Sequence, residues 1–253
     1  RDVERSRGLG DVYKRQLGYI RKAVQDFDLI QKGDKIAVGV SGGKDSLVLL
    51  AGLAQMRRFA EFDYDITAVT IDPGFNGVPN NYDAVARLCE KLDVPFSLVH
   101  TQIGEIVFDI RKEPNPCSLC ANMRRGALHD AAKAAGCNKL ALGHNNDDVI
   151  ETFIMNLFNE GRIGCFSPKT HLDRKDITVI RPLVLAPESQ VLSACNRNGF
   201  EIVKSVCPAD KTTTRQKTKE FLRDMEHKDK GFKLRMFTAL RKSGVDGWGY
   251  PDK

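Results

Sequence analysis

Six consecutive residues combine the groups that bind a phosphate: Ser41, Gly42, Gly43, Lys44, Asp45 and Ser46. The two glycines let the main chain approach a phosphoryl group closely and adopt backbone angles that other residues resist. The serine hydroxyls can bond phosphate oxygens, the lysine supplies a positive charge, and the aspartate can hold Mg2+ directly or through water. The spacing differs from that of the Walker loop, which has four residues between its first glycine and the Gly-Lys pair.

The residues on either side of this segment give it a context. An apolar run at 36–40 predicts a strand, and a second run at 47–53 predicts a helix. A glycine turn between a strand and a helix directs backbone N–H groups and the positive end of the helix towards one point. The segment therefore predicts a nucleotide phosphate site rather than an ordinary turn that is rich in serine and glycine by chance.

Two cysteines three positions apart, Cys117 and Cys120, stand at the start of a second predicted helix, 119–135. Thiols at this spacing can bind one metal ion or cluster. We expect the helix end, together with Arg124 and Arg125, to lower the pKa of both thiols. A single pair of this kind is a moderate signal, because a zinc site would need two further ligands and no second pair follows.

Cys207 is the candidate third thiol ligand, because it follows a strand-like segment at 201–203 and is expected in a loop. Three cysteines from two distant segments suit an iron–sulfur cluster that leaves one iron open for an exogenous group. A zinc knuckle, a redox pair, or a Cys207 that is simply a small buried residue are the alternatives. The remaining cysteines are expected to serve packing: Cys89, Cys137, Cys165 and Cys195.

Polar residues follow two other predicted strands. Asp72 comes directly after the second strand, while His144, Asn145 and Asp148 follow the fourth. The carboxyl ends of parallel strands rim one crevice, so these side chains should lie near the phosphate-binding turn. Imidazole, amide and carboxylate groups there favour contacts with a nucleotide and Mg2+, although an isolated histidine is more often structural.

The elements that must position these groups alternate along the chain. Predicted strands cover 35–40, 66–71, 96–100, 139–143 and 178–180, and predicted helices cover 18–26, 80–92, 119–135 and 187–198. Such alternation predicts an α/β fold, a mostly parallel sheet with helices on both faces. From 211 to 242 the chain is rich in Lys and Arg but keeps a helical apolar stripe, which predicts a small, basic, helical C-terminal region.

Bulk properties narrow the classes further. The 253 residues carry a formal charge of +6, which is compatible with an RNA partner. Seven cysteines without a secretion signal argue against a disulfide framework, and the absence of a long apolar stretch or signal peptide predicts a cytoplasmic protein without a membrane anchor. We expect a non-native or disordered extension at 1–16, a catalytic domain at 17–207, and the basic helical region at 208–253.

Taken together, these motifs resemble the tRNA 2-thiocytidine synthase family of PP-loop ATP pyrophosphatases. They are SGGKDS, PCSLC followed by two arginines, LGHNNDD, IRPL and the late Cys207. The resemblance implies that ATP adenylates the C2 oxygen of an anticodon-loop cytidine, and that sulfur carried on a 4Fe-4S cluster then replaces this oxygen. It also implies tRNA as substrate, a sulfur donor such as a cysteine desulfurase, and possible homodimers.

The resemblance assigns roles to individual residues. It implies that 41–46 binds the ATP phosphates, that Asp45 and Asp148 assist Mg2+, and that His144 contacts the nucleotide. Cys117, Cys120 and Cys207 would hold the cluster. One departure is that Pro208-Ala209-Asp210 follows Cys207 where several family members have a second Cys-x-x-Cys.

Four alternatives stay open at this point. A ligase similar to lysidine synthetase would adenylate the same cytidine oxygen but use lysine and need none of the three cysteines. A thiol relay would work without iron. The acceptor could be a different RNA or a small molecule, and a binding module with a degenerate nucleotide site would release no pyrophosphate.

Overall fold

The computed structural model describes residues 17–112, 116–204, 206–208 and 214–250. The expected extension at 1–16 lies outside the described residues. A six-stranded sheet forms the centre, in the order β3-β2-β1-β4-β6-β5. Its strands are β1 (Lys35–Gly39), β2 (Asp65–Asp72), β3 (Phe96–His100), β4 (Lys139–Ala141), β5 (Lys169–Leu172) and β6 (Ile177–Ile180). Neighbouring strands are parallel except β5, which pairs antiparallel with β6 at the sheet edge.

Both faces of the sheet are buried, as expected for parallel strands that are rich in apolar residues. In β1, Ile36 and Val38 belong to one core cluster and Ala37 belongs to the cluster on the opposite face. The sequence pattern therefore predicted the fold class correctly. It missed β5, because Lys-Thr-His-Leu is neither an apolar run nor a clear alternation.

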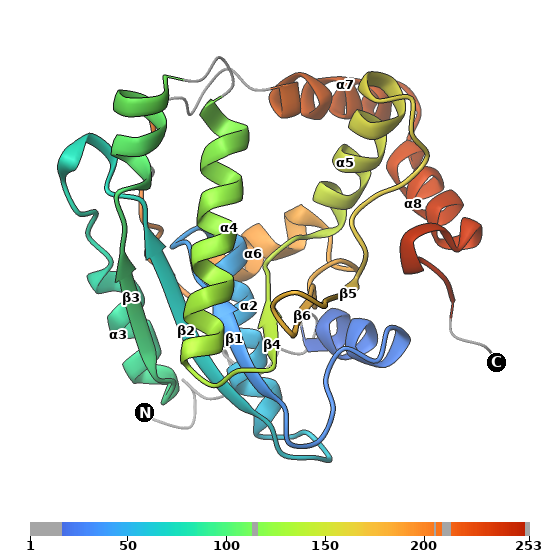
Figure 1. Cartoon of the computed structure of the whole chain (residues 1–253). Helices are drawn as coiled ribbons and strands as arrows, with labels where there is room; N and C mark the ends of the chain where they lie inside the picture. The colour runs from blue at the N-terminus through green and yellow to red at the C-terminus, as the bar shows by residue number, and fades with distance from the viewer. Residues whose placement is uncertain (1–16, 113–115, 205, 209–213, 251–253) are drawn as a thin grey trace.

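Helices cover both faces of this sheet (Figure 1). The main ones are α2 (Lys44–Arg57), α3 (Asp83–Leu92), α4 (Pro116–Ala134), α5 (Asn146–Asn159), α6 (Glu188–Arg197), α7 (Thr214–Lys228) and α8 (Phe232–Ser243). A further helix spans 17–26, and short turns form η1 (Phe75–Gly77), η2 (Glu105–Arg111) and η3 (Val245–Gly247). Helix α2 packs against α6 and α3 on one face, whereas α4 packs against β1, β2 and β4 on the other.

Three expected boundaries were wrong. The helix predicted at 119–135 begins at Pro116, so Cys117, which was expected before the helix, lies inside α4 together with Cys120. Proline suits the first helical position because its missing N–H would have no helical partner there. The helix predicted at 80–92 begins at Asp83. The segment 201–203 joins no strand, and the Val203 N–H bonds instead to the carbonyl oxygen of Gly42 at 3.0 Å.

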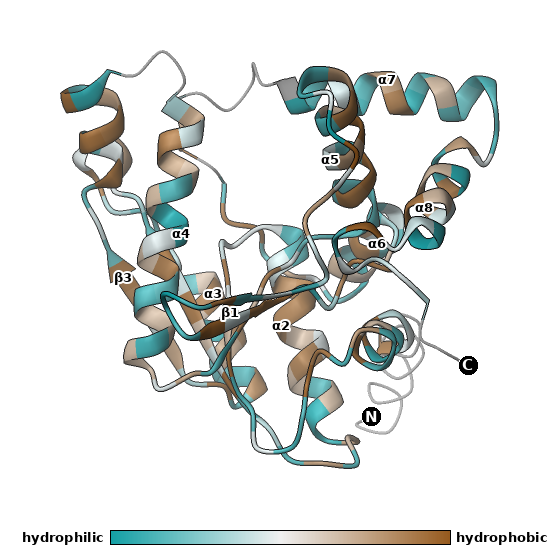
Figure 2. Cartoon of the chain, turned by 45° about the vertical axis from the view of Figure 1, so that its right-hand side comes forward, coloured by the Kyte–Doolittle hydropathy of each residue, from teal (hydrophilic) through white to brown (hydrophobic). Residues whose placement is uncertain are grey.

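The C-terminal helices pack on the body of the protein. Leu222 of α7 joins Ile150 and Ile154 of α5 in one buried cluster, and Trp248 and Leu240 belong to the main core. Figure 2 shows mostly hydrophilic colour along α7 and hydrophobic colour along much of α5, which it covers. None of the helices in the described part of the chain is long and apolar enough to cross a membrane.

Candidate active site

The turn between β1 and α2 is shaped for an anion. Gly42 has a φ of +80°, a conformation that glycine adopts at little cost. The Ser41 hydroxyl oxygen accepts the Gly43 N–H at 3.4 Å, and the Ser46 hydroxyl donates to the Gly43 carbonyl at 2.9 Å. Gly43, the residue before α2, has no side chain that could cap the first N–H groups of the helix. These donors therefore remain available to an anionic ligand.

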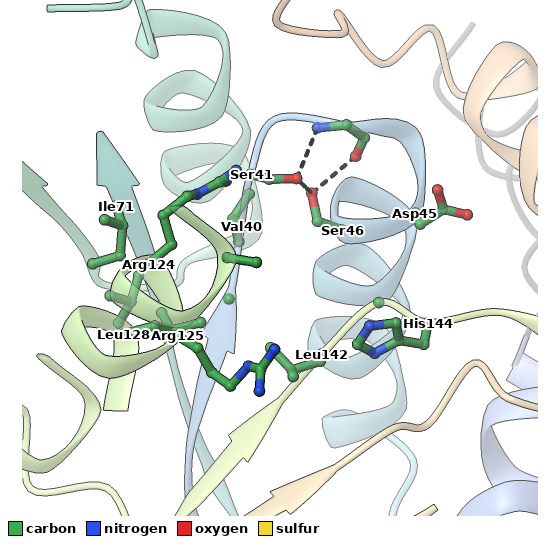
Figure 3. A pocket seen from close by; sticks show the side chains of 15 residues that line it. Val40, Ser41, Asp45, Ser46, Ile71, Arg124, Arg125, Leu128, Leu142 and His144 are labelled. Atoms are coloured by element: carbon green, nitrogen blue, oxygen red, sulfur yellow. Dashed lines mark hydrogen bonds between the residues drawn. The ribbon is translucent and has the colours of Figure 1, made fainter. Parts of the chain in front are cut away.

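A cavity of about 390 Å3 opens next to this turn, and Figure 3 shows its lining. The turn contributes Ser41, Gly43, Asp45 and Ser46, and the end of β4 contributes Gly143 and His144. Arg124 and Arg125 of α4 line the opposite wall, with Arg124 reaching towards Ser41 and Arg125 lying nearer His144. The expected crevice thus brings together the turn after β1 and the segment after β4.

Lys44 points into a group of carboxylates at the rim of this cavity. Its ammonium lies 2.8 Å from Asp45 and 3.0 Å from Glu188, the first residue of α6. Burial lowers the pKa of Lys44, but hydrogen bonds and attraction from both carboxylates outweigh burial and raise the pKa above the ordinary value. Lys44 is therefore a fixed cation beside the phosphate-binding turn.

The start of α5 lies against the same turn. Asn145 caps this helix by accepting the N–H groups of Asp147 and Asp148, while its own side-chain amide donates to Asp45 at 2.9 Å. Asp148 completes a capping box by accepting the Asn145 N–H at 2.9 Å. The two carboxylates predicted to assist Mg2+ are therefore linked through one residue: Asn145 donates its side-chain amide to Asp45 and its backbone N–H to Asp148.

Burial changes the acidity of the carboxyl groups at this helix start. Desolvation raises the pKa of Asp148, which also pairs with Arg215 of α7 at 3.4 Å. Glu151, one turn further along α5, has a pKa raised to about 7 by burial and by the negative charge of Asp148. The positive charge of Arg215 on α7 lowers the pKa of both carboxyl groups, but burial outweighs it.

His144 is held as a neutral ring. Desolvation, followed by the positive charges of Arg181 and Arg215, lowers its pKa to about 3. The ring centroid lies 4.8 Å from that of Phe166, and its Nδ1 atom has no hydrogen-bond partner among the described residues. A neutral imidazole can donate or accept one hydrogen bond, but it cannot supply a positive charge to a phosphate.

Asp72 does not line the cavity. Its carboxylate accepts the N–H groups of Gly74 and Asn80 at 3.2 and 3.1 Å and lies 3.1 Å from the His100 ring. The side chain is almost fully buried and holds the loop after β2 in place. Its contact with a nucleotide stays a prediction that this geometry does not support.

The three predicted thiol ligands lie in one region. Cys117 is exposed, Cys120 is buried, and Cys207 packs on the same apolar cluster as Cys120. The expectation of lowered thiol pKa values was wrong for Cys120: burial raises its pKa, and the charges of Cys207 and Cys117 add to this, while Arg124 acts in the opposite direction. Burial dominates because the Cys120 side chain faces the core.

The three cysteines are thiolate donors, which are the ligands that iron–sulfur clusters use. In the described part of the chain, no three His, Cys, Asp or Glu side chains form a group that could hold one metal ion. A cluster contains several irons that bind different cysteines, so its ligands need not converge on one point. Cys120 and Cys207 pack on one apolar cluster, and Cys117 lies one helical turn before Cys120 in α4.

The sequence analysis missed the roles of several residues at this site. It expected Arg124 and Arg125 to act on the thiols, but it did not predict that they also line the cavity of the phosphate-binding turn. Their position one turn beyond Cys120 was the available signal. Glu188 and Arg215 had no such signal, because only the packing of α6 and α7 brings them to the start of α5 and to Lys44.

Comparison with known proteins agrees with these features. A family model described as a PP-loop domain matches residues 13–225. The tRNA-cytidine(32) 2-sulfurtransferase of Pelobacter propionicus (strain DSM 2379 / NBRC 103807 / OttBd1) is 40% identical over 232 residues, which cover 90% of this chain and 86% of that protein. The protein of the same name from Geobacter sulfurreducens (strain ATCC 51573 / DSM 12127 / PCA) is 38% identical over 231 residues, covering 90% and 89%.

A solved structure is also similar over most of the chain. It is the U34-tRNA thiolase NcsA from Methanococcus maripaludis with its 4Fe-4S cluster, at a TM-score of 0.76 and 27% sequence identity. The match covers 91% of this chain and 78% of that chain. The arrangement of sheet and helices around the cavity is therefore shared with a tRNA-thiolating protein.

Proposed function

The chain belongs to the PP-loop domain family, and from this premise we propose that it is an ATP-dependent tRNA sulfurtransferase that converts a cytidine to 2-thiocytidine. One observation carries the proposal: a single cavity is lined by the phosphate-binding turn and by Arg124, which lies one helical turn beyond Cys120. An enzyme that first activates a base with ATP and then transfers sulfur to it needs its ATP-binding turn and its sulfur-carrying thiols close together. Relatives at 40% and 38% identity that carry this activity in their names support the same conclusion.

The first step would take place at the turn. The cytidine C2 oxygen attacks the α-phosphorus of ATP, a P–O bond forms, and pyrophosphate leaves with the electrons of the broken bond. The free N–H groups at the start of α2 and the Lys44 ammonium can stabilise the charge that develops on pyrophosphate. Asp45 and Asp148 would hold Mg2+, and His144 would contact the nucleotide as a neutral ring.

The second step would take place where the cavity meets α4. Sulfide attacks C2 of the adenylated base and forms a C–S bond, the C2–O bond breaks, and AMP leaves with the former C2 oxygen and the electrons of the broken bond. A 4Fe-4S cluster on Cys117, Cys120 and Cys207 would supply an open iron that holds the attacking sulfur. Arg124 lies one helical turn beyond Cys120 and reaches towards Ser41, where its positive charge can attract the AMP phosphate.

The partners belong to the same proposal. The basic outer surface of α7 and α8 can contact the tRNA backbone, since phosphate contacts need positive charge but no sequence information. A cysteine desulfurase as sulfur donor, a homodimer and a cytoplasmic location stand as expectations with it.

The test is to purify the chain without oxygen and measure iron, acid-labile sulfide and the visible spectrum, with a Cys117→Ser variant beside it. We expect about four irons per chain in the wild type and a loss of iron in the variant. The same protein should then form 2-thiocytidine in tRNA and release pyrophosphate only with ATP. If iron-free protein or the Cys117→Ser variant modifies cytidine with lysine instead of sulfur, the chain is a ligase and the proposal is wrong.

A further inference from the structure

A chain of ion pairs connects the phosphate-binding turn to the basic helix α7. The Lys44 ammonium lies 3.0 Å from Glu188, and the Glu188 carboxylate lies 2.8 Å from Lys219 of α7. Glu188 is itself fixed, because its N–H donates to the Asp147 carboxylate at 2.7 Å. One carboxylate thus lies between the lysine of the ATP site and a lysine of the C-terminal region.

These pairs differ from ordinary surface ion pairs. The side chains of Lys44 and Glu188 are only 21% and 27% exposed. Burial raises the pKa of Glu188, but hydrogen bonds from Lys219 and Lys44 outweigh it and keep the pKa below its usual range. The Lys44–Glu188 pair is therefore screened less than an isolated, exposed ion pair.

We propose that Glu188 is a positioning residue for Lys44, and that Lys219 of α7 holds Glu188 in place. This inference rests on the proposed function. An ammonium group has three N–H donors, and Asp45 and Glu188 accept from Lys44 on two sides. The two carboxylates leave one donor free and fix its direction, which is what a phosphate at the turn requires.

The inference predicts a particular pattern of kinetic change. Without Glu188, Lys44 keeps Asp45 as its only carboxylate partner in this group and can rotate away from the phosphates. Turnover should fall, because a misplacement of about 1 Å can cost about 100-fold in rate. The affinity for ATP should not fall in parallel, because the substitution also removes a negative charge that repels the polyphosphate.

The experiment compares Glu188→Ala, Glu188→Gln and Lys219→Ala with the wild type. For each variant, equilibrium binding of Mg·ATP, tRNA-dependent pyrophosphate release and Tm are measured. We expect Glu188→Ala to lower kcat by about 10–100-fold while the Kd for ATP changes by less than about 3-fold. Glu188→Gln should retain more activity, because its amide oxygen can still accept from Lys44, and Lys219→Ala should lower kcat by a smaller factor.

Lys22→Ala is the control. It also removes one lysine from an ion pair, but Lys22 is 64% exposed, lies 3.2 Å from Asp26, and belongs to the helix at 17–26 rather than to the crevice or to α7 and α8. Its kcat should equal that of the wild type. In the double variant Glu188→Ala/Lys219→Ala, the loss should match that of Glu188→Ala alone, since both residues act through one contact.

Two results would overturn the inference. One is an unchanged kcat in Glu188→Ala, and the other is a loss of kcat that is matched by weaker ATP binding and a lower Tm, which would indicate a purely structural role. A wild-type chain that binds ATP but releases no pyrophosphate with any tRNA would instead overturn the proposed function. The wild-type assay therefore distinguishes failure of the proposed function from failure of the positioning role of Glu188.

Discussion

The two halves of the site are built in different ways. In the nucleotide half, Lys44, Asp45, Asn145 and Asp148 hold one another through contacts of 2.8–2.9 Å within the fold itself. In the thiol half, Cys117 is exposed, Cys120 is buried with a raised pKa, and the described side chains form no single-ion site. The comparison shows that polar contacts between side chains and backbone fix the nucleotide half, whereas burial against the core is the main influence on Cys120 in the thiol half.

The largest expected effect breaks the thiol half alone. Cys120→Ser should abolish iron binding and thiolation, because even substitutions outside the ligand set of a metal site cost 10–100-fold and loss of a ligand should exceed about 100-fold. Binding of Mg·ATP should stay within about 2-fold of the wild type, since the turn at 41–46 needs no thiol. Iron content, tRNA thiolation and ATP binding measured side by side test this separation.

Cys89→Ser is the matched control for this substitution. Cys89 is a buried thiol on α3, on the other face of the sheet, where its role is packing. The Cys89→Ser variant should keep its iron and its thiolation activity at temperatures where the protein is folded. Equal loss of iron in both variants would mean that the assay reports destabilisation rather than loss of a ligand.

Lys44→Ala should have the converse effect: it should impair the nucleotide half and leave the thiol half intact. Removal of one group that stabilises transition-state charge costs about 100–1000-fold in rate, so we expect a loss of this size in pyrophosphate release. Iron and labile sulfide should remain at the wild-type level. If this variant loses its iron as well, the two halves are not independent and the comparison fails; the exposed Lys133→Ala provides the unaffected reference.

Sequence reasoning found the parts of the site that are local in the chain. The turn at 41–46 and the capping residues Asn145 and Asp148 follow strands directly, so a motif and a strand are enough to place them. The parallel sheet was also predictable, because buried strands carry apolar runs. Short elements such as β5, with a polar sequence at the sheet edge, left no such signal.

The parts that depend on tertiary packing could not be predicted. Cys120 was expected to be acidified by the helix end and Arg124, yet burial against the core raises its pKa. Glu188 reaches Lys44 only because α6 packs beside α2, and the segment 201–203 bonds to Gly42 instead of joining the sheet. Each of these outcomes depends on which elements pack against one another, and the local sequence around each residue does not determine this packing.

A pH-dependent effect should mark the acidic edge of the nucleotide half. Glu151 has a pKa raised from 4.5 to about 7 in the folded protein, and its side chain is only 6% exposed. As pH rises through this interval the unfolded chain loses the proton first, so the free energy of unfolding falls by up to about 3 kcal/mol, at 1.36 kcal/mol per unit. Below pH 4.5 Glu151 is protonated in both the folded and the unfolded chain, so this destabilisation is absent.

Glu151→Gln should remove that loss. We expect the variant to gain stability relative to the wild type between pH 4 and pH 8, by about 3 kcal/mol or less, because an amide stays neutral throughout. Urea unfolding at several pH values measures the difference. A constant difference between the two proteins across this range would show that Glu151 titrates normally and that the acidic cluster is not strained by burial.

A last pair of substitutions tests the contact that joins the two halves. A Cβ atom on Gly42 would lie 2.6 Å from the Val203 side chain, on the segment that leads to Cys207. Gly42→Ala should therefore lower both ATP binding and stability, while Gly33→Ala has a similar φ of +82° but nothing within 4 Å of the added atom. The variants share the cost of a left-handed alanine, about 1–2 kcal/mol, so the difference between them isolates the collision, about 1–3 kcal/mol. If Gly42→Ala also lowers iron content, Val203 transmits the displacement to Cys207 and the two halves are mechanically linked. If the variant keeps the wild-type iron content, the two halves are in contact but a displacement in one does not disturb the other.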